Sequence, residues 1–316
     1  MSRGLGGTAQ RPPRHRLGAL HAALAWALLP LWAALDIPLS LACALGWRFH
    51  RPRLYASLRS TRRRRHGLCL VLPGIEGSGL FSYRMVCGVA RSGNGRPGFR
   101  GQILDVPWGH GWWPAQLVAN VTSKAHRQRW TARLVRIVRR QRRLAPRKPI
   151  IIVAHSAGAG LLVELLEALA ATARQRRCVD LAVLLAPSIS PTRDLSAAAR
   201  AAGSIVTVAA PADWLWLGIG TTLAGTCDRS FSPSAGLMGL HTQRPDNVRL
   251  RWWTPADVRF GFLANHCTAV APAFVSSLIA DHGSAICDTT TVAFVREQAG
   301  SSTEPDRPTC QSSILL

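Results

Sequence analysis

Short apolar runs rich in β-branched residues alternate along the chain with segments that carry apolar residues at helical spacing. Continuous apolar runs are typical of strands buried on both faces, and spacings of three and four residues are typical of amphipathic helices. The runs predict strands over residues 68–72, 102–106, 150–153, 181–185, 205–210 and 248–253. The spaced segments predict helices over residues 120–144, 158–173, 195–202 and 272–280. This alternation indicates an α/β fold, with a mostly parallel central sheet and helices on both faces.

The longest predicted helix, over residues 120–144, has one apolar face and one strongly basic face. Its apolar positions, Trp130, Leu134, Ile137 and Val138, keep helical spacing. The opposite face carries Arg127, Arg129, Arg133, Arg136, Arg139, Arg140, Arg142 and Arg143. A basic face of this kind is either simply solvated or in contact with anionic lipid, and the sequence leaves both interpretations open.

The N-terminal part of the chain predicts a targeting segment. We expect a basic tail over residues 1–16, an apolar segment over 17–47 and a basic linker over 48–65. An α/β domain is expected over residues 66–287 and a C-terminal tail over 288–316. A basic head before an apolar run is typical of a signal peptide or signal anchor, although Asp36 and two prolines also allow a buried or interfacial hairpin. The arginines after the apolar run favour a cytoplasmic domain, whereas cleavage would export it. We therefore expect a membrane-associated or exported bacterial protein, with the side of the membrane left open.

Charge narrows the choice of partners. The 316 residues carry a formal net charge of +23, which favours an anionic partner such as a phospholipid surface or nucleic acid. Of the 39 basic residues only Lys124 and Lys148 are lysine, a bias typical of a GC-rich genome. No segment resembles a nucleic-acid-binding module. Nucleic acid is therefore not expected as a partner, while an anionic membrane surface is retained as one.

The eight cysteines are scattered and predict no metal centre. They show no spacing typical of zinc ligands, alone or with histidine, so we expect neither a metal nor a cofactor. Cys69 and Cys178 fall in or beside predicted strands, where they would act as small apolar residues. The even count allows disulfides, for example between Cys287 and Cys310, but the sequence establishes no pairing.

The chemistry of the chain centres on Ser156, which follows the strand predicted over residues 150–153 and precedes a predicted helix. Ala154 lies two residues before it and Gly158 two residues after it. Small residues at these positions let the chain reverse sharply, and the turn lifts the serine oxygen above the edge of the sheet. The first helical N–H groups, that of Ala157 among them, then point at a developing anion. The alternative is a serine that caps an ordinary buried helix.

A glycine-rich loop, Pro-Gly-Ile-Glu-Gly-Ser-Gly, follows the first predicted strand over residues 73–79. The N–H groups of Gly74 or Ile75 are candidates for a second oxyanion donor, since glycine lets the backbone approach a substrate closely. A plain turn between strand and helix explains the loop equally well. Glu76 either caps the next helix or lines the pocket. The segment that follows the second predicted strand contains Trp108, His110 and Trp112. These residues form either an apolar pocket wall or a cover over the sheet edge.

An acid and a histidine follow later in the chain. Asp213 comes just after the fifth predicted strand, where an acid that orients a catalytic histidine belongs, although a turn residue or helix cap fits as well. His266 lies in a loop before the closing helix. Asp228 is the second candidate acid and lies in a glycine-rich ordered insertion over residues 218–247 that is expected to overhang the pocket. His110 is the rival histidine, but it precedes the serine in the chain.

The order of these elements resembles the α/β-hydrolase superfamily over roughly residues 66–282, in the manner of a lipase or esterase. The resemblance rests on Ala-His-Ser-Ala-Gly around the serine, Pro-Ala-Asp around the acid and Asn-His-Cys around the histidine. The chain departs from the family pattern at Ala154, where glycine is usual, and in a first loop that lacks a His-Gly pair. The resemblance implies the nucleophile Ser156, the general base His266, the orienting acid Asp213, and oxyanion donors on Ala157 and on Ile75 or Gly74.

The implied activity is hydrolysis of ester bonds, less readily of amide bonds, through an acyl-enzyme intermediate. The substrate is expected to be a small-molecule or lipid ester, whose identity the fold does not dictate. One alternative is a catalytically silent hydrolase fold that acts as a membrane-associated binding or scaffold protein, favoured by Ala154 and by the unexplained insertion. The other is an acyltransferase with the same triad. Labelling of Ser156 by a fluorophosphonate separates enzyme from scaffold, and an added alcohol acceptor reveals transfer.

Overall fold

A six-stranded sheet in which all neighbouring strands are parallel forms the centre of the molecule, with strand order β2-β1-β3-β4-β5-β6. The computed structural model describes residues 58–75, 80–91, 98–109, 123–172, 177–211, 213–253, 266 and 269–282. The strands are β1 (Leu68–Leu72), β2 (Gln102–Asp105), β3 (Ile150–His155), β4 (Val179–Leu185), β5 (Ala202–Ala209) and β6 (Val248–Trp252).

The strand order reverses direction between β1 and β3. From β1 the chain moves outward to β2, and it then crosses back over β1 to add β3, β4, β5 and β6 on the other side. In an open parallel sheet, ligands bind outside the carboxyl ends of the strands at such a switch point. The loop that follows β1 and the turn that follows β3 both lie there, since Leu72 pairs with Ala154 at the ends of the two strands.

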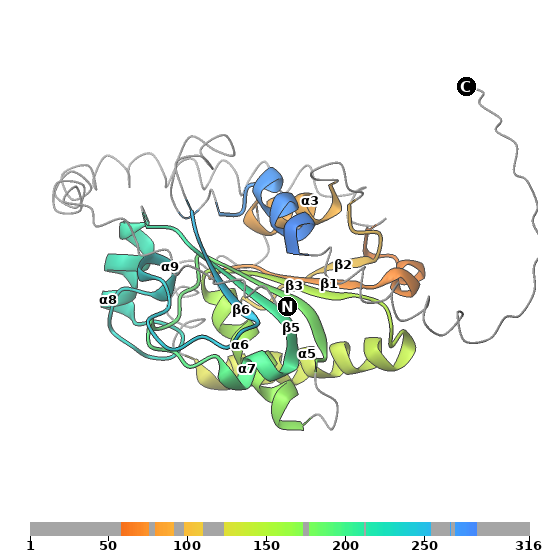
Figure 1. Ribbon diagram of the computed structural model, residues 1–316, viewed down its shortest axis with the longest axis horizontal. Helices are drawn as coiled ribbons and strands as arrows, with labels where there is room; N and C mark the ends of the chain where they lie inside the picture. Colours follow the sequence, from red (N-terminus) through yellow and green to blue (C-terminus); the bar gives the residue numbers. More distant parts are fainter. Residues whose placement is uncertain are drawn as a thin grey trace, which may run out of the picture.

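Helices cover both faces of the sheet (Figure 1). The α5, α6 and α7 helices lie on one face, and α3 and the helix over residues 272–282 lie on the other. A 3-10 helix, η1, precedes β1, and a π-helix and two short helices lie between β5 and β6. The bounds are η1 (Thr61–His66), α3 (Leu80–Ala90), α5 (Lys124–Leu144), α6 (Ala157–Thr172), α7 (Ser196–Ala201), η2 (Leu215–Gly220), α8 (Thr221–Ala224) and α9 (Ala235–Met238).

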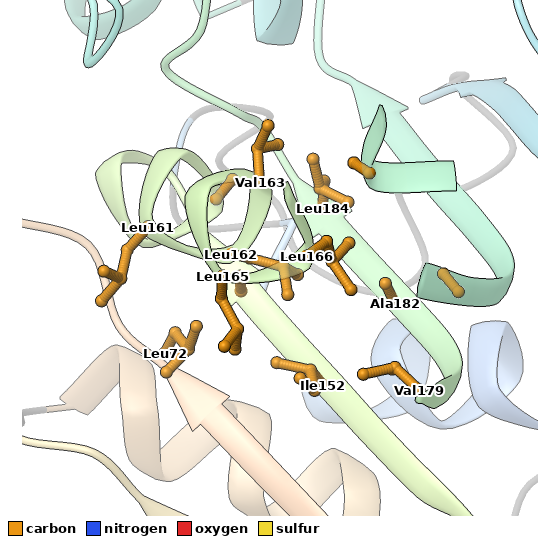
Figure 2. Packing of buried hydrophobic residues seen from close by; sticks show 14 of the residues in the cluster. Leu72, Ile152, Leu161, Leu162, Val163, Leu165, Leu166, Val179, Ala182 and Leu184 are labelled. Atoms are coloured by element: carbon orange, nitrogen blue, oxygen red, sulfur yellow. The ribbon is translucent and has the colours of Figure 1, made fainter. Parts of the chain in front are cut away.

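Alternate residues of each strand enter two separate cores. In β1, Leu68, Leu70 and Leu72 pack with α5 and α6, while Cys69 and Val71 pack with α3 and the helix over residues 272–282. Figure 2 shows the first core, in which apolar side chains of α6 lie over β1, β3 and β4. Because both faces of the central strands are covered, β1, β3 and β4 are apolar at nearly every position, whereas the edge strand β6 carries Arg249 and Arg251.

The ends of the predicted strands agree with the structure to within three residues, and the largest shift is at the start of β5. The helix predicted over residues 195–202 ends at Ala201, and β5 begins at the next residue, three positions earlier than predicted. The sequence before the boundary is mostly alanine, and Gly203 and Ser204, which are typical turn residues, lie inside β5. Composition therefore does not locate the boundary. Pairing of Ala202 with Val179 of β4 fixes where the strand begins.

Several predicted features lie outside the described residues. These are the N-terminal tail, the apolar segment and most of the linker, the C-terminal tail, and the Cys287–Cys310 pair. Within the part of the chain that the structure describes, no helix is both long enough and apolar enough to cross a membrane.

Candidate functional site

Ser156 occupies the sharp turn between β3 and α6, with a backbone φ of 53°. A residue other than glycine rarely adopts this left-handed conformation, which tends to occur where the surrounding structure and function require it. Hydrogen bonds from neighbouring segments hold it here. The Ser156 N–H donates to the Leu185 carbonyl at 2.9 Å, and the Ser188 N–H donates to the Ser156 carbonyl at 3.1 Å. The turn is therefore locked between the ends of β3 and β4.

The two small residues that flank Ser156 play different parts. A Cβ atom on Gly158 would lie 2.3 Å from the carbonyl oxygen of Pro73 and 2.5 Å from that of Leu72. Glycine at this position therefore lets the first turn of α6 approach the loop after β1. Ala154, by contrast, is fully buried in the first core, where its methyl group is accommodated. The core of this fold therefore accepts alanine at position 154.

The loop after β1 is held from behind by Trp108. Its indole N–H donates to the carbonyl oxygen of Pro73 at 2.7 Å, and its side chain is fully buried. The carbonyl oxygen of Trp108 in turn contacts Nε2 of His126 in α5 at 2.6 Å. Trp108 was predicted either to line the pocket or to cover the sheet edge, and the structure places it, fully buried, beneath the loop that it supports. Ile75 packs partly buried against the same core.

Asp213 and His266, the predicted acid and base, lie in contact beyond the carboxyl end of β5. Nδ1 of His266 lies 2.5 Å from Oδ2 of Asp213, and the side chains are 10% and 1% exposed. Since a carboxylate only accepts hydrogen bonds, Nδ1 carries a proton, and in the neutral imidazole Nε2 then keeps its lone pair. The arrangement fixes the ring and the tautomer that a general base requires.

His155, the residue before Ser156, ties the histidine segment to the serine turn. The two imidazole ring centroids of His155 and His266 are 4.4 Å apart. Nε2 of His155 donates to the carbonyl oxygen of His266 at 3.1 Å. His155 is fully buried and also faces the ring of Phe81 in α3 at 5.8 Å. The structure therefore brings the serine turn, the histidine and the acid to one place on the carboxyl edge of the sheet.

Trp216, in η2, is a site residue that the sequence analysis missed. Its ring centroid lies 6.4 Å from that of His266, and the residue is 39% exposed. An exposed tryptophan beside a histidine on the rim of a site offers an apolar surface to a substrate. Its position three residues after Asp213 was the available signal, but the sequence could not show that η2 turns it toward the histidine.

Asp228, the second candidate acid, is used elsewhere. Its carboxylate accepts hydrogen bonds from the Ser190 N–H at 2.9 Å and 3.1 Å and from the Thr226 hydroxyl at 2.5 Å. It helps to line a cavity of about 420 Å³ that includes neither Ser156 nor His266 among its lining residues. Asp228 therefore orders the loop between α8 and α9. Three further predicted residues lie outside the described part of the chain: Glu76, His110 and Trp112.

The two buried cysteines of the described part of the chain, Cys69 and Cys227, are poor candidates for a nucleophile. Burial raises the pKa of the Cys227 thiol to about 12, and burial also raises the pKa of Cys69. Because the thiolate is the reactive form, both groups are inert near neutral pH. Among the described residues, no group of three or more His, Cys, Asp or Glu side chains could hold a metal ion.

Comparisons with known proteins identify no family for this chain. No family model matches the chain, and no curated protein matches it. Among solved structures, the chain is similar to a Xanthomonas campestris pv. campestris protein described as a candidate hydrolase of the alpha/beta superfamily. The two are 17% identical over 68% of this chain and 99% of that one, with a TM-score of 0.37. We therefore infer function from the geometry of the site.

Proposed function

We propose that the chain is a serine hydrolase of the α/β-hydrolase superfamily that cleaves ester bonds through an acyl-enzyme intermediate. The observation that carries this proposal is the pairing of His266 with Asp213 beside the strained turn of Ser156. A buried imidazole whose Nδ1–H is held by a carboxylate is poised to take a proton through Nε2. Ser156 is the hydroxyl that it would serve.

The reaction proceeds in two halves. As the Ser156 oxygen attacks the ester carbonyl, Nε2 of His266 accepts the hydroxyl proton, and Asp213 stabilises the imidazolium. His266 then gives that proton to the departing alcohol, which leaves an acyl-serine. A water molecule attacks the acyl group, with His266 again acting as base, and the acid product and the free serine are released.

The oxyanion of each tetrahedral intermediate lies between α6 and the loop after β1. Ala157 is the first residue of α6, so its N–H has no carbonyl partner within the helix and is available to an anion. The N–H of Gly74 or Ile75 supplies the second donor, from the loop that Gly158 allows to approach and Trp108 supports. Loss of one such donor typically costs about 3–4 kcal/mol of transition-state stabilisation.

Trp216 favours substrates with an apolar acyl or alcohol group, because it provides the exposed apolar surface beside His266. Small-molecule and lipid esters both satisfy this requirement. Ala154 was one of two observations that favoured a silent binding protein. It no longer favours that alternative, because Ala154 is accommodated in the core and leaves the serine turn intact.

Fluorophosphonate labelling of the full chain, run beside hydrolysis of aryl esters of increasing acyl length, tests the proposal. Ser156→Ala is expected to abolish labelling and to lower hydrolysis at least about a thousandfold. Ser196→Ala, at an exposed position in α7, is the matched control and keeps both activities. A folded wild-type chain that resists labelling favours the binding protein, and near-full activity in Ser156→Ala rejects the assignment. Ester formation with an added alcohol indicates an acyltransferase.

A further inference from the structure

The edge of the sheet opposite the proposed active site is lined with basic residues. All six strands are parallel and therefore begin at this one edge. An exposed basic residue lies two to four positions before the first residue of each of the strands β1 to β6. These six residues, here called the basic edge, are Arg65, Arg100, Lys148, Arg177, Arg200 and Arg244.

The C-terminal half of α5 extends the basic edge. Its polar face carries exposed arginines, and neither α5 nor η1 contains an aspartate or glutamate. The Gln141 side chain donates to the carbonyl oxygen of Arg64 at 2.9 Å, which joins the end of α5 to η1. Leu144, at the end of the helix, is 62% exposed among these charges. The exposed arginines of this half are Arg136, Arg139, Arg140 and Arg143.

Carboxylates do little to offset this charge. Asp180 in β4 is engaged by the Arg142 guanidinium at 2.5 Å and by the Ile150 N–H at 2.6 Å. Asp246, in the turn before β6, is exposed near Arg244. Asp194, which is exposed, also feels the charge of Arg200. Among the described residues, the six basic side chains of the edge therefore outnumber these three carboxylates, and Asp180 already has a cationic partner in Arg142.

Complementing the helix dipoles explains only part of this pattern. Basic residues in the last turn of a helix are stabilising because the carbonyl end of the helix is negative. Arg200 in α7 and Arg143 in α5 fit that role. Arg100, Lys148 and Arg177 lie outside helices, so helix dipoles do not account for their charge.

The order of segments in the chain favours a membrane over nucleic acid as the partner. Residues 17–47 contain Asp36 as their single charged residue, and a basic linker joins them to η1. Since η1 directly precedes β1, this apolar sequence is connected to the domain at the basic edge. In Figure 1, η1 lies at the opposite end of the β1 strand from the α8 and α9 region.

We propose that the basic edge and the C-terminal half of α5 form a docking surface for the anionic headgroups of a phospholipid membrane. Basic residues that follow an apolar membrane segment bind anionic lipid through the surface potential, over about one Debye length. In this orientation the carboxyl edge, with Ser156 and His266, faces away from the bilayer. The docking itself is independent of the proposed hydrolase activity.

Partition of the full chain between buffer and vesicles tests the proposal. The measured quantity is the ratio of the partition coefficient on phosphatidylcholine mixed with phosphatidylglycerol to that on phosphatidylcholine alone. This ratio removes the contribution of the apolar segment, which is common to both. The edge variant carries Arg100→Gln, Arg177→Gln and Arg200→Gln. The matched control carries Lys124→Gln, Arg129→Gln and Arg229→Gln, which remove the same charge from exposed positions toward the carboxyl edge.

The edge variant is expected to lower the ratio on the order of a hundredfold, since each basic residue near an anionic surface strengthens binding about fivefold. The control is expected to lower it by less than tenfold, and added salt weakens the wild-type ratio. An equal loss in both variants would overturn the proposal. So would a wild-type ratio near one, or loss of binding to duplex DNA but not to vesicles in the edge variant.

A bilayer against the other edge is the remaining orientation to exclude. Exposed apolar side chains of the segment between β5 and β6, Leu223 at 76% and Phe231 at 69%, lie there. Leu223→Ser combined with Phe231→Ser is expected to leave the ratio and the binding to neutral vesicles unchanged. If this variant loses vesicle binding while the edge variant binds like the wild type, the membrane lies against the carboxyl edge and the proposal is wrong.

Discussion

A methyl group at position 158 tests whether the loop after β1 takes part in the reaction. The added Cβ would lie 2.3 Å from the Pro73 carbonyl oxygen and 2.5 Å from that of Leu72. Both partners are backbone atoms, so no change of side-chain rotamer relieves the contact. Ordinary contacts of a Cβ begin near 3.4 Å, and α6 and the loop must therefore separate by about 1 Å.

That displacement sets the expected size of the effect. A misplacement of about 1 Å in a catalytic site costs on the order of a hundredfold in rate, which corresponds to about 3 kcal/mol of activation free energy. Overpacking of a close contact costs about 1–3 kcal/mol of folding stability. Gly158→Ala is therefore expected to fold with a lowered Tm and to lose about a hundredfold in kcat, with a smaller change in KM.

Gly160→Ala is the control, because it adds the same methyl group two residues further along α6. Its Cβ would lie 2.4 Å from Cβ and 2.7 Å from Sγ of Cys227, away from the loop after β1. We expect a similar loss of Tm with kcat largely kept. Both variants are assayed on an aryl ester well below their Tm values. A folded Gly158→Ala chain with wild-type kcat would refute the role of the loop. An equal loss of kcat in the two variants would mean that the loss comes from a shift of α6 as a whole.

Three further predictions address the triad, the rim and the folding stability. Asp213→Asn keeps the fold but disfavours the tautomer of His266 that a base needs, so kcat on an aryl ester falls on the order of 10⁴-fold. Trp216→Ala raises KM for long-chain esters about tenfold and changes kcat less, since it removes apolar contact area. Burial, together with the charge of Arg249, lowers the pKa of His282. The unfolded chain therefore takes up this proton first, and stability falls as pH drops through about 6.5. When Tm is measured over a series of pH values, the Tm of His282→Gln is expected to fall less than that of the wild type as the pH drops through this range.

The sheet was predictable because both of its faces are covered. Continuous apolar runs such as Ile150–Val153 are typical of strands covered on both faces, and they locate the strands to within a few residues. The serine turn was predictable for a related reason. Only small residues fit around a sharp reversal between a buried strand and a buried helix, so Ala154 and Gly158 mark it.

The segment between β5 and β6 was not predictable in the same way. Its short elements are held by long-range backbone bonds, such as that from the Ala210 N–H to the Gly236 carbonyl at 2.6 Å. A four-residue helix is not stable by its own propensity, and its sequence therefore carries little signal. For the same reason, neither the position of Trp216 beside His266 nor the role of Asp228 could be predicted, since both depend on where this segment lies. The contact of His155 with the His266 backbone joins residues 111 positions apart, and no local pattern indicates it.

The two small residues around the serine, Ala154 and Gly158, are required for different structural reasons. Ala154 directs a fully buried methyl group into the core beneath α6, whereas Gly158 meets the backbone of the loop after β1. Glycine at position 154 would empty part of that core and increase the freedom of the unfolded chain. Ala154→Gly is therefore expected to lower the unfolding free energy by about 1 kcal/mol and to leave kcat unchanged. Measured by urea denaturation beside ester hydrolysis, a loss of kcat at unchanged stability would mean that position 154 shapes the serine turn directly.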